Sequence, residues 1–159
     1  MRNLNDKMKD IFEKSVEDLK DRNQNLLRPE HILLQLLYDE NEVTKILEEL
    51  NVNTEEIADE LESYIDSQYG IFYGFSDQVY VSRELSYILE LARKEARLFK
   101  QKDVGPLHFL LGLLRDGSTH AARVLKKYGV DYERVLQKVK EHEDEFMDKQ
   151  SPITRLPQI

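Results

Sequence analysis

The chain has 159 residues, of which 40% are apolar and 34% charged, and its 31 acidic and 23 basic side chains give a formal net charge of −8. That length suits one domain, or two small halves that share a core. The absence of cysteine excludes a disulfide scaffold, a thiolate metal site and a cysteine nucleophile. An acidic total also argues against a general nucleic-acid binder, which gains affinity by neutralising phosphates.

The sequence gives no indication of a membrane or export segment. No apolar run approaches the roughly 20 residues that a membrane-spanning helix needs. The first residues, MRNLNDKMKD, lack the apolar stretch of a signal peptide. We therefore expect a soluble, cytoplasmic protein that binds neither membrane nor nucleic acid, and we expect the isolated domain to be a monomer.

The first 65 residues predict four helices. Apolar residues at positions 4, 8, 11, 12, 16 and 19 follow the spacing of an amphipathic helix, and Asn5 is a suitable N-cap. The next helix begins at Pro29, and its sequence PEHILLQLL is apolar on most of its circumference, so we expect it at the buried centre. A short helix follows at about 42–50. Asn51 suits the left-handed conformation that ends a helix, and Asn53 suits the cap of a fourth helix.

Residues 66–80, DSQYGIFYGFSDQVY, carry two glycines and no helical period, which is typical of a linker. The linker is unusually aromatic, and it leaves two interpretations open. In the favoured one, the rings lie across the seam between the halves as extra core. In the other, Phe72, Tyr73 and Phe75 form a partly exposed apolar patch that receives a partner.

The second half of the chain repeats the first. VGPLHFLLGLLRD (104–116) aligns with LRPEHILLQLLYD (27–39), and Gly-Val-Asp at 129–131 matches Asn-Val-Asn at 51–53. Ser82 takes the place of Asn5 as the first N-cap. We therefore predict an all-α fold of eight helices, two tandem four-helix repeats related by a pseudo-twofold axis. The predicted domain spans 1–148, with repeat one at 3–65, the aromatic linker at 66–80 and repeat two at 81–145; a linker-like tail follows at 149–159.

These repeats resemble a known family. PEHILLQLL and HFLLGLLRDGSTHAARVLKKYGVD are similar to the N-terminal domain of Clp/Hsp100 AAA+ ATPases of the ClpA and ClpC type, and the resemblance covers residues 3 to about 145. It implies a domain that docks adaptor proteins and protein substrates, and that works with an ATPase ring and a peptidase through a parent chain. A stand-alone helical regulatory or ligand-binding protein of the same fold is the alternative.

No catalytic chemistry is predicted for this chain. It has no G-x-x-x-x-G-K-[ST] phosphate loop, and no nucleophile, acid or base constellation emerges. His31 and His108 occupy matching repeat positions, which favours a shared structural task such as a buried hydrogen bond. Because no H-E-x-x-H or Glu-x-x-His pattern is present, we expect no metal, no cofactor and no enzyme activity.

The family resemblance also implies candidate binding residues. In ClpC-type relatives, the glutamate of the repeated motif and a hydroxyl residue 25 positions earlier read phosphoarginine on marked substrates. The matching residues are Asn5 and Glu30 in repeat one, and Ser82 and Leu107 in repeat two. Leucine accepts no hydrogen bond from a guanidinium, so this resemblance supports at most one complete site. The structural alternative for Glu30 is an anion that interacts with its helix dipole.

Charge divides unevenly between the halves. Residues 1–65 hold 8 basic and 17 acidic groups, a net of −9, whereas residues 81–145 hold 13 and 11, a net of +2. Cations crowd the end of one predicted helix, at Arg93, Lys94, Arg97, Lys100 and Lys102. They form either a solvated face that suits a helix C-terminus or a surface that steers acidic partners, with the acidic stretch 39–62 attracting basic ones. We expect docking at the starts of the first two helices of each repeat and along the groove between the repeats.

Overall fold

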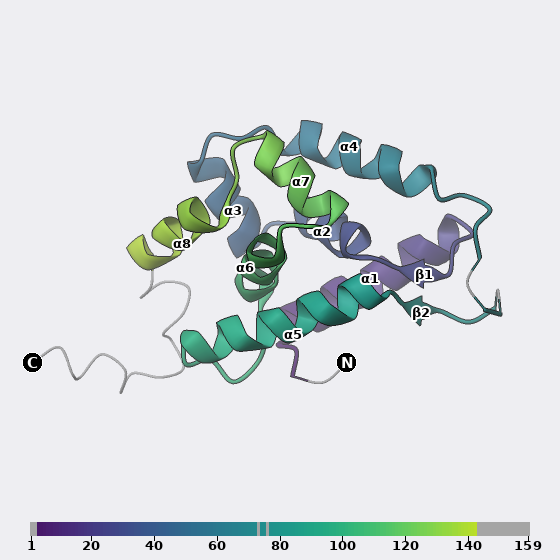
Figure 1. Ribbon diagram of the computed structural model, residues 1–159, viewed down its shortest axis with the longest axis horizontal. Coiled ribbons are helices and arrows are strands. Elements are labelled where there is room, and N and C mark those ends of the chain that lie inside the picture. Colours follow the sequence, from purple (N-terminus) through teal and green to yellow (C-terminus); the bar gives the residue numbers. More distant parts are fainter. Residues whose placement is uncertain (1–2, 73, 76, 143–159) are drawn as a thin grey trace, which may run out of the picture.

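The computed structural model describes residues 3–72, 74–75 and 77–142, which form eight α-helices and two strands of two residues each (Figure 1). Four helices fall in each repeat, so the predicted all-α fold is confirmed. The predicted tail lies outside the described residues. In chain order the elements are α1 (Asp6–Asp21), β1 (Leu26–Leu27), α2 (Pro29–Leu37), α3 (Glu42–Glu49), α4 (Thr54–Asp66), β2 (Tyr80–Val81), α5 (Arg83–Leu98), α6 (Pro106–Asp116), α7 (His120–Lys127) and α8 (Tyr132–Glu141).

The ends of the helices follow the predicted local chemistry. Asn5 Oδ1 accepts from Met8 N at 2.9 Å at the start of α1, and Ser82 Oγ accepts from Leu85 N at 3.0 Å at the start of α5. Each bond satisfies a backbone donor that has no partner within its own helix. The two matching helices therefore begin in the same way with different side chains.

The turn between the third and fourth helix of each repeat is also as predicted. Asn51 has φ 59° and Gly129 has φ 85°, the left-handed conformation that ends a helix. Asn53 and Asp131 then cap α4 and α8, accepting from the backbone N–H groups three residues further on. Two different sequences thus produce one turn geometry.

Two short parallel pairings join the repeats, and the sequence did not predict them. β1 pairs with β2, with Leu27 opposite Val81, and an isolated bridge joins Leu4 to Val104. Leu4 and Val81 are matching positions of the repeat, as are Leu27 and Val104, so the pseudo-twofold axis exchanges the two pairings. Each repeat's first helix consequently starts beside the second helix of the other repeat.

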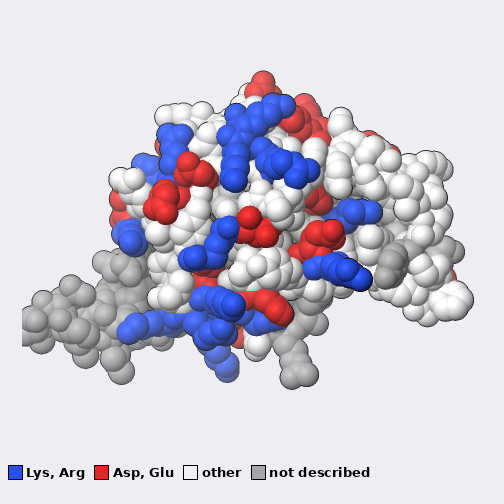
Figure 2. Space-filling model, viewed as in Figure 1, with Lys and Arg blue, Asp and Glu red and all other residues white. Residues whose placement is uncertain are grey.

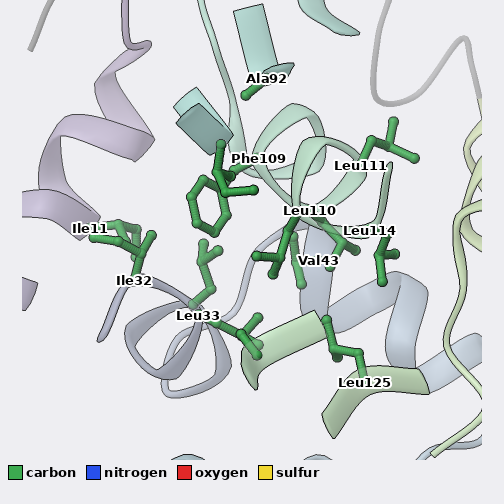
Figure 3. Packing of buried hydrophobic residues seen from close by; sticks show 14 of the residues in the cluster. Ile11, Ile32, Leu33, Val43, Ala92, Phe109, Leu110, Leu111, Leu114 and Leu125 are labelled. Carbon is green, nitrogen blue, oxygen red and sulfur yellow. The ribbon is translucent and has the colours of Figure 1, made fainter. Parts of the chain in front are cut away.

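The core is one continuous cluster built around α2 and α6, the two helices expected at the centre. Both are buried along almost their whole length. In Figure 3, the side chains of Ile32 and Leu33 from α2 and of Phe109 from α6 point into the same space. Because this apolar volume is shared, the two repeats form one folded unit and not two independent bundles.

The aromatic linker differs from the favoured interpretation. Tyr69, Phe72 and Phe75 are 71%, 48% and 72% exposed, so these rings are not extra core at the seam, and that interpretation is wrong for them. Tyr73 lies outside the described residues. The linker passes around the outside of the molecule between α4 and β2 (Figure 1), where little apolar surface is available to cover the rings. An exposed aromatic segment is the interpretation that the geometry leaves.

Candidate docking pocket between the repeats

A pocket of about 230 Å³ lies at the junction of the two repeats. Helices α2 and α4 of repeat one and α5 and α7 of repeat two each supply part of its wall, and three of these four helices face it with their N-terminal ends. Helix N-termini favour anions, because their first N–H groups and the helix dipole point outward. The lining residues are Arg28, Pro29, Glu30, Tyr64, Glu84, Ser118, Thr119, His120 and Arg123.

Glu30 is the buried carboxylate of this pocket. Its side chain is held at the second position of α2 by Pro29, whose fixed φ starts the helix, and the residue is only 3% exposed. Glu30 Oε2 accepts from Ala121 N at 2.8 Å, so a residue of repeat one satisfies a free donor at the start of α7 in repeat two. The structural alternative holds in a modified form, because the helix end that this anion contacts is in the other repeat.

Leu107, the residue of repeat two that matches Glu30, cannot accept a hydrogen bond from the start of a helix. Leu107 is 1% exposed and belongs to the core. The donor that matches Ala121 N is Val43 N at the start of α3, and Asn41 Oδ1 accepts from it at 2.8 Å. Asn41 Oδ1 caps α3 by accepting from both Val43 N and Thr44 N, whereas Thr119 Oγ1 caps α7 at Ala122 N alone and Glu30 takes the remaining donor, Ala121 N. This difference explains why leucine is tolerated at 107.

The structure regroups the four residues implied by the family resemblance. Asn5 lies at the start of α1 against Gly105, because its backbone N–H donates to Val104 O at 2.9 Å. Ser82 lies at the start of α5 beside β1, since its N–H donates to Leu27 O at 2.9 Å. The family resemblance pairs Asn5 with Glu30 inside one repeat, whereas the hydrogen bonds of this structure place Asn5 beside the start of α6 and Glu30 beside the start of α7. Across the seam, the start of α5 joins the start of α2, and the start of α1 joins the start of α6.

This regrouping changes what each junction holds. The α2–α5 junction has the hydroxyl of Ser82 and the carboxylate of Glu30, whereas the two matching positions at the α1–α6 junction hold Asn5 and Leu107. Ser82 is 3% exposed, and its hydroxyl already caps α5. One junction therefore retains both chemical features and the other has lost both.

Charged and aromatic side chains complete the pocket. Arg28 and Arg123 bring two guanidinium groups and Glu84 a second carboxylate. Arg123 Nη1 donates to Ser118 O at 2.6 Å, which fixes one guanidinium at the rim. The rings of Tyr64 and His120 stack with centroids 4.1 Å apart. Carboxylates and guanidiniums side by side suit a ligand that carries charge of both signs.

The stacked ring pair separates this pocket from a second, more open hollow. The second hollow has a volume of about 430 Å³ and is lined by residues of α4 and by His120. Two of its α4 residues, Asp59 and Glu60, are acidic, and Glu60 also binds Lys127 of α7 at 2.8 Å. A partner that follows the seam would pass from the pocket of mixed charge onto this acidic face.

The two matching histidines perform the same structural task, as predicted. Nδ1 of His31 accepts from Arg28 N at 3.0 Å, and Nδ1 of His108 accepts from Gly105 N at 2.8 Å, so each ring caps the helix it belongs to. Burial lowers the pKa of both imidazoles to about 4, and for His31 the cationic Arg28 and Arg22 add to the effect. Neither ring is protonated at neutral pH.

One group of possible metal ligands occurs within the described part of the chain, at the seam between α3 and α8. Glu49, Glu141 and His142 bring their ligand atoms within 4.8 Å of one another. The ammonium of Lys138 already lies 3.4 Å from Glu141 and 3.9 Å from Glu49, and His142 Nε2 lies 2.8 Å from Glu49. These residues are therefore linked to one another as a polar contact between the repeats.

Sequence reasoning missed several residues of the pocket, namely Arg28, Tyr64, Glu84, His120 and Arg123. Four of them lie more than thirty positions from Glu30, and no local pattern brings them together. The only signal available was the repeat itself, since a pseudo-twofold packing places the helix starts of one half beside those of the other. None of the described helices combines the length and apolar composition needed to cross a membrane.

Comparison with solved structures defines the class of the fold. The N-terminal domain of the ClpV1 ATPase from Escherichia coli superposes with a TM-score of 0.76 at 20% identity, over 92% of this chain and 89% of that one. The N-terminal domain of Hsp104 from Candida albicans gives a TM-score of 0.73 at 17% identity, over 94% of this chain and 98% of that one. At these identities the likeness concerns the fold, which is that of Clp and Hsp104 N-terminal domains.

Sequence comparison identifies the family. The model of the Clp repeat (R) N-terminal domain matches residues 3–128 and 88–158, and the chain belongs to this family. ClpC/MecB of Bacillus subtilis, a negative regulator of genetic competence, is 36% identical over 116 residues, which is 72% of this chain and 14% of that protein. ClpB of Oceanobacillus iheyensis is 34% identical over the same shares. The matched region is the N-terminal domain of these relatives, and the chain spans only 14% of their length.

Proposed function

We propose that this chain is the docking domain of a Clp-type ATP-dependent unfoldase, and that it binds adaptor proteins and protein substrates for delivery to unfolding and degradation. The observation that carries the proposal is the pocket between the repeats, where helix starts from both halves surround the buried carboxylate of Glu30. Such a pocket suits a protruding side chain of a protein partner. In the cell, we expect the domain to act in the cytoplasm beside an ATPase ring and a peptidase.

The neighbouring structures support protein partners. One structural neighbour is described as a peptide from the SciI protein, and it superposes with a TM-score of 0.75 at 20% identity. Another concerns the coevolution of the ATPase ClpV with the TssB-TssC sheath and the accessory HsiE protein. These partners are those of the neighbouring proteins. For this chain, they support only the proposal that its partner is a protein.

A capture experiment with a charge-neutral variant tests the docking proposal. Glu30→Gln removes the negative charge but keeps a carbonyl oxygen to accept from Ala121 N, so the fold is preserved. The immobilised wild-type chain, Glu30→Gln and a control, Glu90→Gln on the exposed face of α5, are incubated with lysate and the bound proteins compared. We expect wild type and Glu90→Gln to retain the same proteins and Glu30→Gln to lose them. Equal retention by all three would exclude the pocket, and no retention by wild type would contradict docking.

Phosphoarginine is the specific ligand that the α2–α5 junction favours. Glu30 supplies a carboxylate for the guanidinium, and Arg28, Arg123 and the helix starts supply donors for the phosphate. The regrouping of Ser82 with Glu30 across the seam is the observation in favour. Binding requires Glu30 to share or release its bond to Ala121 N.

Calorimetric titration with free phosphoarginine tests this ligand. We expect one binding event per chain, lost in Glu30→Gln and unchanged in Leu107→Met, because the α1–α6 junction lacks both polar groups. Arginine and inorganic phosphate, titrated separately, serve as ligand controls. No heat with millimolar phosphoarginine, or the same heat in Glu30→Gln, would end the assignment while leaving protein docking to the capture experiment.

A further inference from the structure

Five cations and an exposed leucine lie at the C-terminal end of α5 and in the residues that follow it. We call this the α5-end patch and define it by six residues. Figure 2 shows basic side chains gathered over this end of α5, at the lower left of the view. All of them except the half-buried Arg93 are exposed. The patch consists of Arg93, Lys94, Arg97, Leu98, Lys100 and Lys102.

Among the residues that the structure describes, the five cations of the patch are not held in salt bridges, although two acidic residues, Glu90 and Asp103, adjoin them in the sequence. Within the described part of the chain, none of them forms an ion pair, whereas Lys7, Arg22 and Lys127 elsewhere each contact one or more carboxylates. Glu95, the nearest buried carboxylate on α5, is bound by Arg115 and Tyr132 and so is not available to the patch. The positive potential of this surface is therefore directed outward.

Leu98 adds apolar area in the middle of the charges. The side chain is 67% exposed, while the next residue, Phe99, turns partly into the core. A large apolar side chain among cations suits an anionic partner that also carries an apolar group. A partner that offered charge alone would leave this leucine uncovered.

Lys100 occupies a backbone conformation that lysine does not favour. Its φ is 59°, at the left-handed position that follows the end of a helix, and the matching residue of repeat one is Asn23 with φ 57°. Asparagine adopts this conformation readily, whereas a long side chain pays roughly 1 kcal/mol. The chain keeps a fifth cation in the patch against that local cost, which favours a task for the charge beyond the fold.

Repeat one shows that the fold itself does not need the patch. At the end of α1, Glu17, Asp21 and Asn23 stand at the positions that match Lys94, Leu98 and Lys100. Repeat one thus has acidic or neutral side chains in place of two cations and an exposed leucine, on a helix of the same length.

We propose that the α5-end patch is a docking surface for an acidic segment of a partner protein, one that places an apolar side chain against Leu98 between flanking carboxylates. The surface is separate from the pocket at Glu30 and does not depend on it. A protein segment fits better than a nucleic acid or a lipid surface, because the patch is confined to the end of α5 and the few residues that follow it, while the chain as a whole carries −8. A long polyanion would extend from the patch onto acidic surface.

Fluorescence anisotropy with defined peptides tests the proposal. The first probe is a short labelled peptide of glutamate and aspartate with one central leucine; a second has serine for the leucine, and a third has lysine for every acid. Lys94→Glu/Leu98→Asp/Lys100→Asn gives the patch the residues of repeat one. Lys9→Glu/Lys20→Glu on α1 is the control, since it changes the net charge by the same amount on exposed side chains outside the patch.

We expect the leucine peptide to bind the wild-type chain, and the patch variant to bind it at least about tenfold more weakly. The control variant should lose less than about threefold, the serine peptide should bind several-fold more weakly, and the lysine peptide not at all. Raising salt from about 50 to 200 mM should weaken binding several-fold. Thermal unfolding of both variants verifies that they are folded.

Three outcomes would overturn the proposal. The first is unchanged binding by the patch variant, and the second is an equal loss in both variants, which would show an effect of net charge alone. The third is tighter binding of anionic vesicles or duplex DNA than of the peptide.

Discussion

Repeat one and repeat two have the same succession of helices, yet they hold their polar groups in place differently. In repeat one, Arg22 at the end of α1 binds Asp18, Glu62 and Asp66 and so joins α1 to α4. In repeat two, the matching residue is Phe99, and Arg115 of α6 instead binds Glu95 and Tyr132. The two repeats share the backbone path and the apolar positions, whereas their charged residues stand at different positions and form different contacts.

The seam between the repeats shows the largest functional difference. At the start of α7, Thr119 accepts from Ala122 N and Glu30 of the other repeat accepts from Ala121 N, whereas at the start of α3 Asn41 accepts from both matching donors. The position of Glu30 is held in repeat two by the buried Leu107. The two junctions therefore differ in polarity, and the pocket lies at the junction that contains Glu30.

Low pH is expected to have the largest effect on the stability of both repeats, because burial lowers the pKa of the matching histidine in each of them. Each imidazole binds a proton at about pH 6.5 when unfolded and at about 4 when folded, so between these values the unfolded chain holds more protons. Stability is thus fully present above pH 6.5 and falls as the pH drops toward 4, by about 3 kcal/mol for each histidine. Protonation also takes the Nδ1 lone pair that caps α2 or α6.

Urea unfolding at a series of pH values between about 7 and 4 measures this loss. The wild-type chain is the reference, and His31→Gln and His108→Gln should each flatten its pH dependence. A pH dependence in either variant that equals that of the wild type would contradict a shared capping role.

The two repeats differ in how closely their first and second helices approach each other. A Cβ atom at Gly112 of α6 would lie 2.9 Å from Ala92 N in the backbone of α5, so these two helices approach closely. The matching residue of repeat one is Gln35, which is half-buried. We expect Gly112→Gln to cost about 3 kcal/mol, at the upper end for overpacking. Thermal or urea unfolding measures the loss, and Gln35→Ala should change stability by less than about 0.5 kcal/mol.

The seam itself can be probed at Glu30. Glu30→Ala leaves Ala121 N without its acceptor in a buried site and should destabilise the chain by about 2 kcal/mol. Glu30→Gln keeps an acceptor and should cost less than half as much. Amide exchange at Ala121 should accelerate in the alanine variant and remain slow in the glutamine variant. If both variants were as stable as wild type, the bond between Glu30 and Ala121 N would not stabilise the start of α7.

The smallest effect is expected in the aromatic linker. Because Tyr69, Phe72 and Phe75 are largely exposed, replacing all three by serine should change the free energy of unfolding by less than about 0.5 kcal/mol. A matched replacement of the buried Phe109 by serine should destabilise strongly. A loss above about 2 kcal/mol in the linker variant would restore the rejected interpretation that these rings are core.

The features that the sequence predicted are those set by neighbouring residues. Helix starts at Pro29 and Pro106, the caps at Asn5 and Ser82, and the turn at Asn51 depend on interactions within a few positions. Periodic apolar residues likewise identified α2 and α6 as central. These contacts have the same energy wherever the helix lies in the fold, so local pattern is sufficient to find them.

The candidate site required contacts that no local pattern contains. The bond between Glu30 and Ala121 joins residues 91 positions apart, and the pairing of β1 with β2 decides which helix starts meet. The repeat alone is compatible with contacts inside each half or across the seam, and only the packing of the two cores selects between them. The linker aromatics were misjudged because aromatic rings usually gain from burial, and here the seam is already filled by α2 and α6.

The central claim is that partners bind at the pocket between the repeats, and the amide of Ala121 reports on it directly because its N–H contacts Glu30. The measurement is a titration of the isotopically labelled chain with phosphoarginine, or with a protein captured by the wild-type chain, followed by amide NMR shifts. The account predicts that the largest shifts occur at Ala121, Arg123, Tyr64 and Glu84, and that they disappear in Glu30→Gln. Shifts concentrated at the α1–α6 junction, around Asn5 and Leu107, or shifts that persist in Glu30→Gln, would contradict it.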